Sequence, residues 1–226
     1  MSGNNHSWLN TSVVKKYIVA ASGLFLALFV LGHSVGNSLM LFSSEMFNRY
    51  GEALITNPLI YVVEFVVGAI FLIHVFFALK VTLENLKARG GIGYKKRVNK
   101  DRNLISFAAS TMPYTGAIIL IFLVFHIVQL KYGTYYEVTY AETVMRDLHI
   151  LLLKYFSVPL ATIGYVFAMI VLTFHVLHGL WSITQTFGVN RSMYNKLFRN
   201  IALGFAMFVL VIYVTFPIWA YLQGVK

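Results

Sequence analysis

Five of the seven histidines lie inside long apolar stretches of the chain, where an ionisable side chain is costly unless it has a partner. They are His33, His74, His126, His175 and His178. A neutral imidazole is also a common metal ligand, because one ring nitrogen carries a free lone pair. For any single histidine, a hydrogen bond to a neighbouring helix explains its position equally well. Four separate stretches that each carry one are harder to explain in that way, and they predict a metal-containing cofactor.

The stretches that carry these histidines are long enough to be membrane-spanning helices. The chain has 226 residues, of which 58% are apolar and only 12% charged, and its mean hydropathy is +0.72. A bilayer core of about 30 Å needs about 20 apolar residues in a helix, and these runs are too long for barrel strands. We expect an all-α membrane protein, a single domain of residues 1–226 with five transmembrane helices. The expected spans are Tyr17–Phe42, Leu59–Leu83, Leu104–Leu130, Tyr155–Phe187 and Ile201–Tyr221.

Charge predicts the orientation of these spans. The net charge is +10, and thirteen of the 18 Lys and Arg residues fall on one side when the spans alternate. Because such residues gather on the cytoplasmic side, we expect a cytoplasmic N-terminus, an outer C-terminus and a multi-pass protein of the cell inner (cytoplasmic) membrane. This distribution argues against a nucleic-acid partner. The basic run Lys87–Arg102 is a topology signal, or in addition docks a cytoplasmic subunit or anionic lipid headgroups.

Depth sorts four of the histidines into two pairs. At about 1.5 Å per helical residue, His126 lies about 8 Å and His33 about 14 Å from the outer ends of their spans. His74 lies about 9 Å from a cytoplasmic end, and His175 lies about 30 Å from Lys154 on the outer side. Two histidines that face each other at one depth form a bis-imidazole haem site. Two such sites at two depths would serve electron transfer across the membrane.

Small residues and a weak internal repeat accompany the histidines. Ser22-Gly23 precedes His33 by the same interval as Thr115-Gly116 precedes His126, and His74 and His175 are each followed by Val. The first two spans therefore correspond to the third and fourth. Glycines near the histidines suit the approach of a flat macrocycle, or simply let helices pack; they are Gly23, Gly32, Gly68, Gly116, Gly164 and Gly179. Three prolines, Pro113, Pro159 and Pro217, lie inside expected spans and are candidate kinks.

The residue types that are missing limit the chemistry of this chain. It contains no cysteine, which excludes disulfides and iron–sulfur clusters of the usual kind. No glycine-rich nucleotide motif opens a strand–helix unit. Flavin, cluster or dicarboxylate chemistry would therefore belong to other chains.

Several stretches resemble the dihaem cytochrome b membrane anchor of succinate:quinone oxidoreductases, the succinate dehydrogenase and fumarate reductase complexes, in their single-anchor, five-helix branch. The resemblance covers nearly the whole chain, and its stretches are SGLFLALFVLGH, EMFNRYGEALITNPLIYVVEF followed by FLIH, TGAIILIFLVFH and, most specific, FHVLHGLWSITQTFG. It implies two haem b groups with axial ligands His33, His74, His126 and His175. The family ligand stands four residues before the Gly of Gly-Leu-aromatic, which favours His175 and leaves His178 as an alternative ligand or a partner of a haem propionate.

The same resemblance implies the function and the partners. A cytoplasmic flavoprotein subunit and an iron–sulfur subunit would exchange electrons with the anchor, which passes them to or from membrane quinone, menaquinone in this branch. The chain would be an electron-transfer subunit without a dicarboxylate site of its own, in contact with lipid and within a complex that can form higher oligomers. Some fumarate reductases of this branch carry a glutamate two residues before the fourth ligand, where this chain has Thr173. That departure argues against their proton route.

Glu64 is the only acid inside an expected span, in the outer half of the second. It is a candidate quinone or proton site, or else a carboxyl bonded to a neighbouring helix or reaching the outer interface. Weaker outer-side candidates are Glu45, Glu52, Asn37 and His149.

Two other functions compete with the respiratory anchor. The chain could be the haem b anchor of another respiratory complex, such as a hydrogenase or formate dehydrogenase, although its helix order does not match theirs. It could also be a transporter with histidine proton relays, but the spans lack the clustered polar residues and broken helices of such a path.

Overall fold

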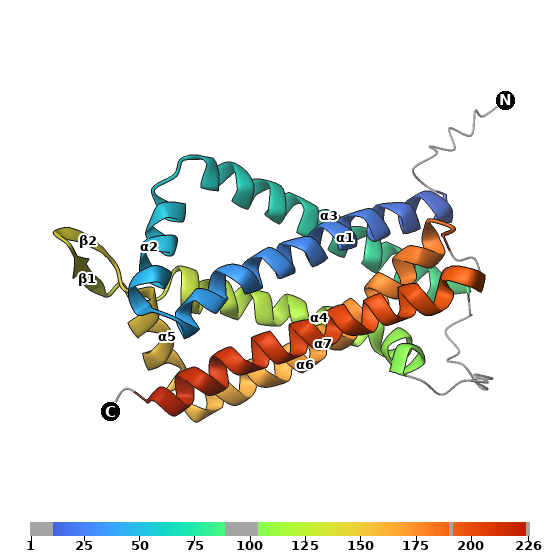
Figure 1. Cartoon of the computed structure of the whole chain (residues 1–226). Coiled ribbons are helices and arrows are strands. Elements are labelled where there is room, and N and C mark those ends of the chain that lie inside the picture. The colour runs from blue at the N-terminus through green and yellow to red at the C-terminus, as the bar shows by residue number, and fades with distance from the viewer. Residues whose placement is uncertain (1–10, 89–103, 190–191, 225–226) are drawn as a thin grey trace.

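The computed structural model describes residues 11–88, 104–189 and 192–224, and these residues are mostly helical. Figure 1 shows long helices running side by side, and the described residues include five of them. Each is long and apolar enough to cross a membrane, so the expected all-α bundle with five spanning helices is confirmed. The helices are α1 (Ser12–Ser38), α3 (Leu59–Ala88), α4 (Leu104–His126), α6 (Pro159–Thr186) and α7 (Ser192–Gln223).

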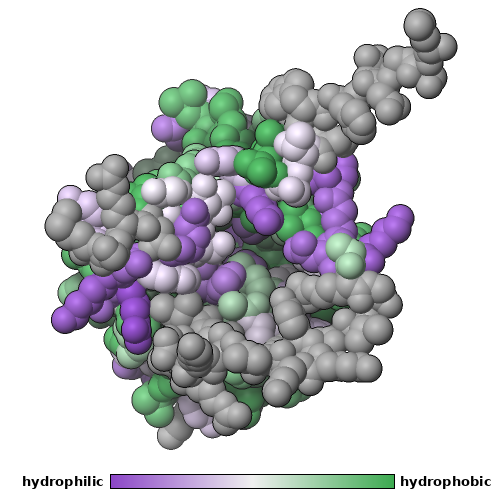
Figure 2. Space-filling view, turned by 90° about the vertical axis from the view of Figure 1, so that its right-hand side faces the viewer, coloured by the Kyte–Doolittle hydropathy of each residue, from purple (hydrophilic) through white to green (hydrophobic). Residues whose placement is uncertain are grey.

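The two ends of the bundle differ in structure. At the end where α1 begins, here called the Lys15 end, Lys15 is buried and donates to Glu84 of α3 at 2.5 Å. Figure 2 looks onto this end, where hydrophilic side chains gather. The described basic residues of the adjoining helix segments are Lys15, Lys16, Lys80, Lys87, Lys196 and Arg199. The rest of the basic run, from Arg89 to Arg102, lies outside the described residues, and the side of the membrane that this end faces stays a prediction.

The opposite end, here called the Asn48 end, carries a layer of short elements that the sequence did not predict (Figure 1). Helix α1 continues into the 3₁₀ turn η2 (Leu39–Leu41), and α4 continues into the π-helical turn η3 (Ile127–Lys131). Two short helices, α2 (Ser44–Ile55) and α5 (Leu148–Phe156), and an antiparallel hairpin complete the layer. In the hairpin, β1 (Glu137–Tyr140) pairs with β2 (Thr143–Arg146), with Glu137 opposite Arg146.

The starts of the fourth and fifth spans differ from expectation. Helix α7 begins at Ser192, nine residues before the expected Ile201. The expected fourth span began at Tyr155, whereas Tyr155 lies in α5 and the spanning helix α6 begins at Pro159. Pro159 occupies the first turn of α6, where its missing N–H is not needed, so it starts the helix and does not kink it. Pro113 and Pro217 do lie inside α4 and α7.

The bundle is packed unevenly. Helix α6 buries eight residues, whereas α3 buries none, and apolar side chains such as Phe65 and Leu72 of α3 are largely exposed. An apolar helix that exposes such large side chains suits lipid as its surroundings, since a water-soluble protein would cover such a surface. The larger core cluster lies towards the Asn48 end and consists of Met40, Phe47, Leu152, Phe156, Tyr165, Phe216 and Ala220.

Candidate cofactor site

The first candidate site is formed by His74 of α3 and His175 of α6. Their ring centroids lie 6.4 Å apart, and the ring planes are inclined by 72°. Helices α3 and α6 are not neighbours in sequence, so this contact arises from the way the bundle is assembled. The histidines expected at one depth on the lysine-rich side therefore lie together in the structure.

A hydroxyl group lies beside each ring of this pair. Ser22 Oγ of α1 is 3.1 Å from His74 Nδ1, and Thr115 Oγ1 of α4 is 3.2 Å from His175 Nδ1. Each hydroxyl donates its own hydrogen to a carbonyl of its own helix, Ser22 to Ile18 at 2.6 Å and Thr115 to Met112 at 3.0 Å. The hydroxyl oxygens are then free to accept from the imidazoles, and in that arrangement Nδ1 carries the proton and Nε2 keeps the lone pair.

The glycine after each hydroxyl residue makes room for the same ring. A Cβ atom on Gly23 would lie 3.1 Å from His74 Cε1, and one on Gly116 would lie 3.5 Å from His175 Cε1. The internal repeat thus places a hydroxyl and a glycine of one helix against a histidine of the next. A Cβ on any of the other four candidate glycines would meet nothing within 4 Å; they are Gly32, Gly68, Gly164 and Gly179.

The second candidate site is formed by His33 of α1 and His126 of α4. Their ring centroids lie 5.9 Å apart, with the planes inclined by 80°. The ring of His33 stacks with that of Phe29, at 5.6 Å between centroids, and with that of Tyr213, at 6.4 Å. His126 Nδ1 is 3.5 Å from the hydroxyl of Tyr165, which is the upper limit for a hydrogen bond. This pair also joins the two histidines expected at one depth.

The dimensions of the two pairs fit a bis-histidine haem. Imidazole–metal bonds are about 2 Å long, which places the centroids of two opposed axial rings at about 6 Å. Among the described residues, no group of three or more His, Cys, Asp or Glu side chains could hold a metal ion. Two ligands alone are a poor site for a bare ion, but they suffice for an iron that a macrocycle already holds. The residues present therefore fit haem, while their role as iron ligands stays a prediction.

His178 lies one helical turn beyond His175 on α6. Its Nδ1 atom is buried and has no hydrogen-bond partner among the residues that the structure describes. An unpaired buried polar atom costs free energy unless a ligand or water satisfies it. His178 therefore suits a polar group of the cofactor, as the expected propionate contact requires. Thr173, in contrast, is buried and donates to Met169 of its own helix at 2.8 Å.

Glu64, the acid expected in the second span, is part of an ion pair. Its Oε1 atom lies 2.5 Å from Nζ of Lys131 in η3, and both side chains are about two-fifths exposed. The pair accounts for an acid at this position without a proton-transfer role. Its assignment to a quinone or proton site stays a prediction.

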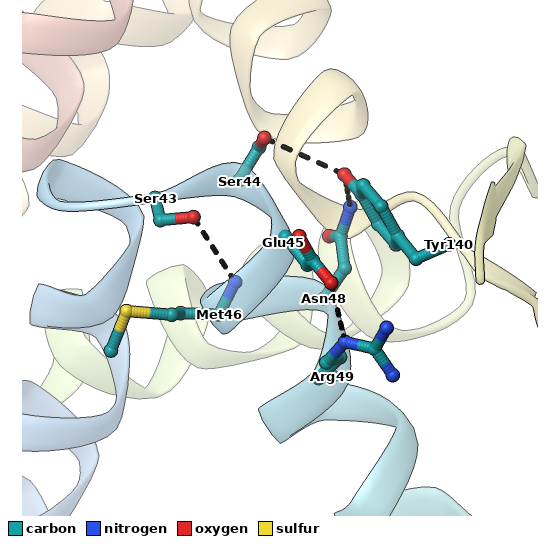
Figure 3. Close-up of polar contacts among 7 residues, drawn as sticks. All are labelled: Ser43, Ser44, Glu45, Met46, Asn48, Arg49 and Tyr140. Atoms are coloured by element: carbon teal, nitrogen blue, oxygen red, sulfur yellow. Dashed lines mark hydrogen bonds and ion pairs between the residues drawn. The ribbon is translucent and has the colours of Figure 1, made fainter.

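Sequence reasoning missed a buried polar network at the Asn48 end. Asn48 of α2 is fully buried; its Nδ2 donates to Asp147 at 2.9 Å, and its Oδ1 accepts from the backbone N–H of His149 at 3.0 Å. Figure 3 shows Asn48 beside Tyr140 of the hairpin, near the start of α2. His149 and Trp219 line a shallow pocket next to this network. The signals in the sequence were two helix N-caps: Ser43 accepts from Met46, and Asp147 accepts from Ile150.

Comparisons with known proteins do not identify a family. No protein-family model matches the chain, and no curated protein or solved structure matches it significantly.

Proposed function

We propose that this chain is the dihaem cytochrome b membrane anchor of a succinate:quinone oxidoreductase. The observation that carries the proposal is the presence of two histidine pairs, with ring centroids 6.4 Å and 5.9 Å apart, in one bundle of apolar helices. His74 and His175 would hold one haem b, and His33 and His126 the other. When bound, the two haems would supply one-electron carriers at two depths of the membrane.

The spacing of the two sites supports transfer along the bundle. Ser22 lies beside His74, and His33 follows Ser22 by 11 positions of α1; Thr115 and His126 repeat this interval in α4. At about 1.5 Å per residue, the pairs are about 16 Å apart along the helices. The protein would hold each haem by its ligands and surround it with apolar helices that exclude water. His178 would add a hydrogen bond from its Nδ1 atom, which has no partner in the described part of the chain.

The proposed partners follow from the resemblance and from the chemistry that this chain lacks. Without cysteine it cannot form an iron–sulfur cluster of the usual kind. An iron–sulfur subunit and a flavoprotein subunit would therefore dock at the Lys15 end, which the proposal places in the cytoplasm. Menaquinone would react near the His33–His126 pair at the opposite surface.

Purification of the full chain with its native partners tests this proposal. We expect about two haem b per chain in a pyridine haemochrome assay, copurified flavin and iron–sulfur subunits, and succinate-dependent reduction of a menaquinone analogue. Absence of haem from carefully prepared protein would overturn the proposal. If the chain holds two haems but copurifies with subunits of a hydrogenase or formate dehydrogenase, the haem assignment stands and the assignment to a succinate:quinone oxidoreductase is overturned.

A further inference from the structure

The two histidine pairs differ in what holds their Nδ1 atoms. We propose that Ser22 and Thr115 are positioning residues for the haem at the His74–His175 pair. They would fix the tautomer of both ligands, aim Nε2 at the iron and strengthen its electron donation, which lowers the reduction potential of this haem. The inference rests on the proposed function and assigns two residues to that site.

The geometry of the hydroxyls supports this assignment. The contacts at 3.1 Å and 3.2 Å to Nδ1 are of ordinary hydrogen-bond length. Ser22 and Thr115 are both buried, so water does not compete freely for the imidazole N–H. Because each hydroxyl hydrogen is directed at a carbonyl of its own helix, the oxygen is left to accept. An imidazole that donates from Nδ1 is a stronger ligand through Nε2.

The arrangement occurs twice. The hydroxyl of Ser22 on α1 contacts Nδ1 of His74 on α3, and the hydroxyl of Thr115 on α4 contacts Nδ1 of His175 on α6. Gly23 and Gly116 then let the two rings lie close to the helices that orient them. Equivalent positions of the internal repeat thus place a hydroxyl beside both ligands of one site, and His74 has the backbone of Val19 as a further hydrogen-bond partner.

The His33–His126 pair has different surroundings. Aromatic rings flank His33, and the hydroxyl of Tyr213, one of these rings, donates to the carbonyl of Val30 at 2.7 Å. The contact of His126 with Tyr165 is at the limit of a hydrogen bond. Loss of the Ser22 or Thr115 hydroxyl should therefore affect one haem only.

The test compares Ser22→Ala and Thr115→Val in the purified full chain. Redox titration should show the midpoint potential of one and the same haem raised in both variants, with the other haem unchanged. Because loss of such an outer-shell bond typically weakens metal binding about 10- to 100-fold, transfer of this haem to apomyoglobin should become at least about 10-fold faster. Ser38→Ala and Ser110→Ala are matched controls, since both hydroxyls donate to carbonyls of their own helices.

Conservative variants separate hydrogen bonding from packing. Ser22→Thr and Thr115→Ser keep the hydroxyl and should keep the wild-type potentials and transfer rates. Shifts of the midpoint potential in these variants as large as those in Ser22→Ala and Thr115→Val would overturn the inference. Unchanged haems in Ser22→Ala and Thr115→Val would overturn it as well. In both cases two haems in the wild type would still uphold the proposed function. A wild type without haem would instead overturn the proposed function itself.

Discussion

Glu64 of α3 and Lys131 of η3 form an ion pair that joins the second spanning helix to the end of the third, with 2.5 Å between Oε1 and Nζ. Helices α3 and α4 otherwise touch little, and α3 buries none of its residues. The pair lies on the same side of the bundle as the Asn48 layer. Its position and its exposure indicate that the pair links α3 to the end of α4 at the surface of the bundle.

Removing the charges of Glu64 and Lys131 should change the free energy of unfolding only slightly. Both side chains are about two-fifths exposed, and exposed ion pairs contribute about 0.2–1 kcal/mol. We expect Glu64→Gln, Lys131→Gln and the double variant to give a coupling energy within that range in a double-mutant cycle of unfolding. Glu45→Gln, which breaks the pair with Arg49 within one helix, is the control. Loss of quinone reduction in Glu64→Gln with both haems retained would show that Glu64 does transfer protons.

Asn48, which is fully buried, should contribute strongly to the stability of the fold. It links α2 to the start of α5 through Asp147 and the N–H of His149. Because Asn48→Ala would remove a buried side chain and leave the partly buried Asp147 carboxylate and His149 N–H without this partner, we expect a loss of about 1–3 kcal/mol in the free energy of unfolding. Asn37→Ala, on the half-buried side of α1, is a suitable comparison. Equal unfolding curves for wild type and Asn48→Ala, measured in the same detergent, would contradict this account.

His149 should make the Asn48 end sensitive to acid. Burial lowers the pKa of His149 below its ordinary 6.5, and the carboxylate of Asp147 opposes this only in part. The unfolded chain then binds a proton more readily, so stability is full above about pH 6.5 and falls as the pH drops towards the folded-state pKa. We expect the wild type to lose more stability than His149→Gln between about pH 7.5 and about pH 5.5. Parallel losses in thermal unfolding would show that His149 is not responsible.

The five spanning helices can be predicted from the sequence because their apolar length is a strong and local signal. The pairing of the histidines can be predicted as well, since alternating helix directions convert residue number into depth. The Asn48 layer cannot be found in this way. Its elements are short, and their positions depend on contacts between distant residues, such as Asn48 with Asp147. The expected start of the fourth span at Tyr155 was wrong for this reason. An apolar run continues through Tyr155, but the chain divides at Ser157 and Pro159 into two helices, α5 and α6.

The roles of Ser22 and Thr115 were also hidden in the sequence. The repeat places each of them 11 residues before a histidine of its own helix, but their partners are the histidines of the other pair. This relationship depends on how the helices pack, which periodicity alone does not give.

The central claim is tested most directly by removing the four histidines one at a time and measuring haem b per chain. Changing His74 or His175 to Ala should perturb or remove one haem, and changing His33 or His126 should affect the other. His178→Ala should retain both, with weaker binding at the His74–His175 pair only. That pattern, read from reduced-minus-oxidised spectra and redox titration, would establish two independent bis-histidine sites. One haem that is insensitive to His33 and His126, or no haem in the wild type, would contradict the account.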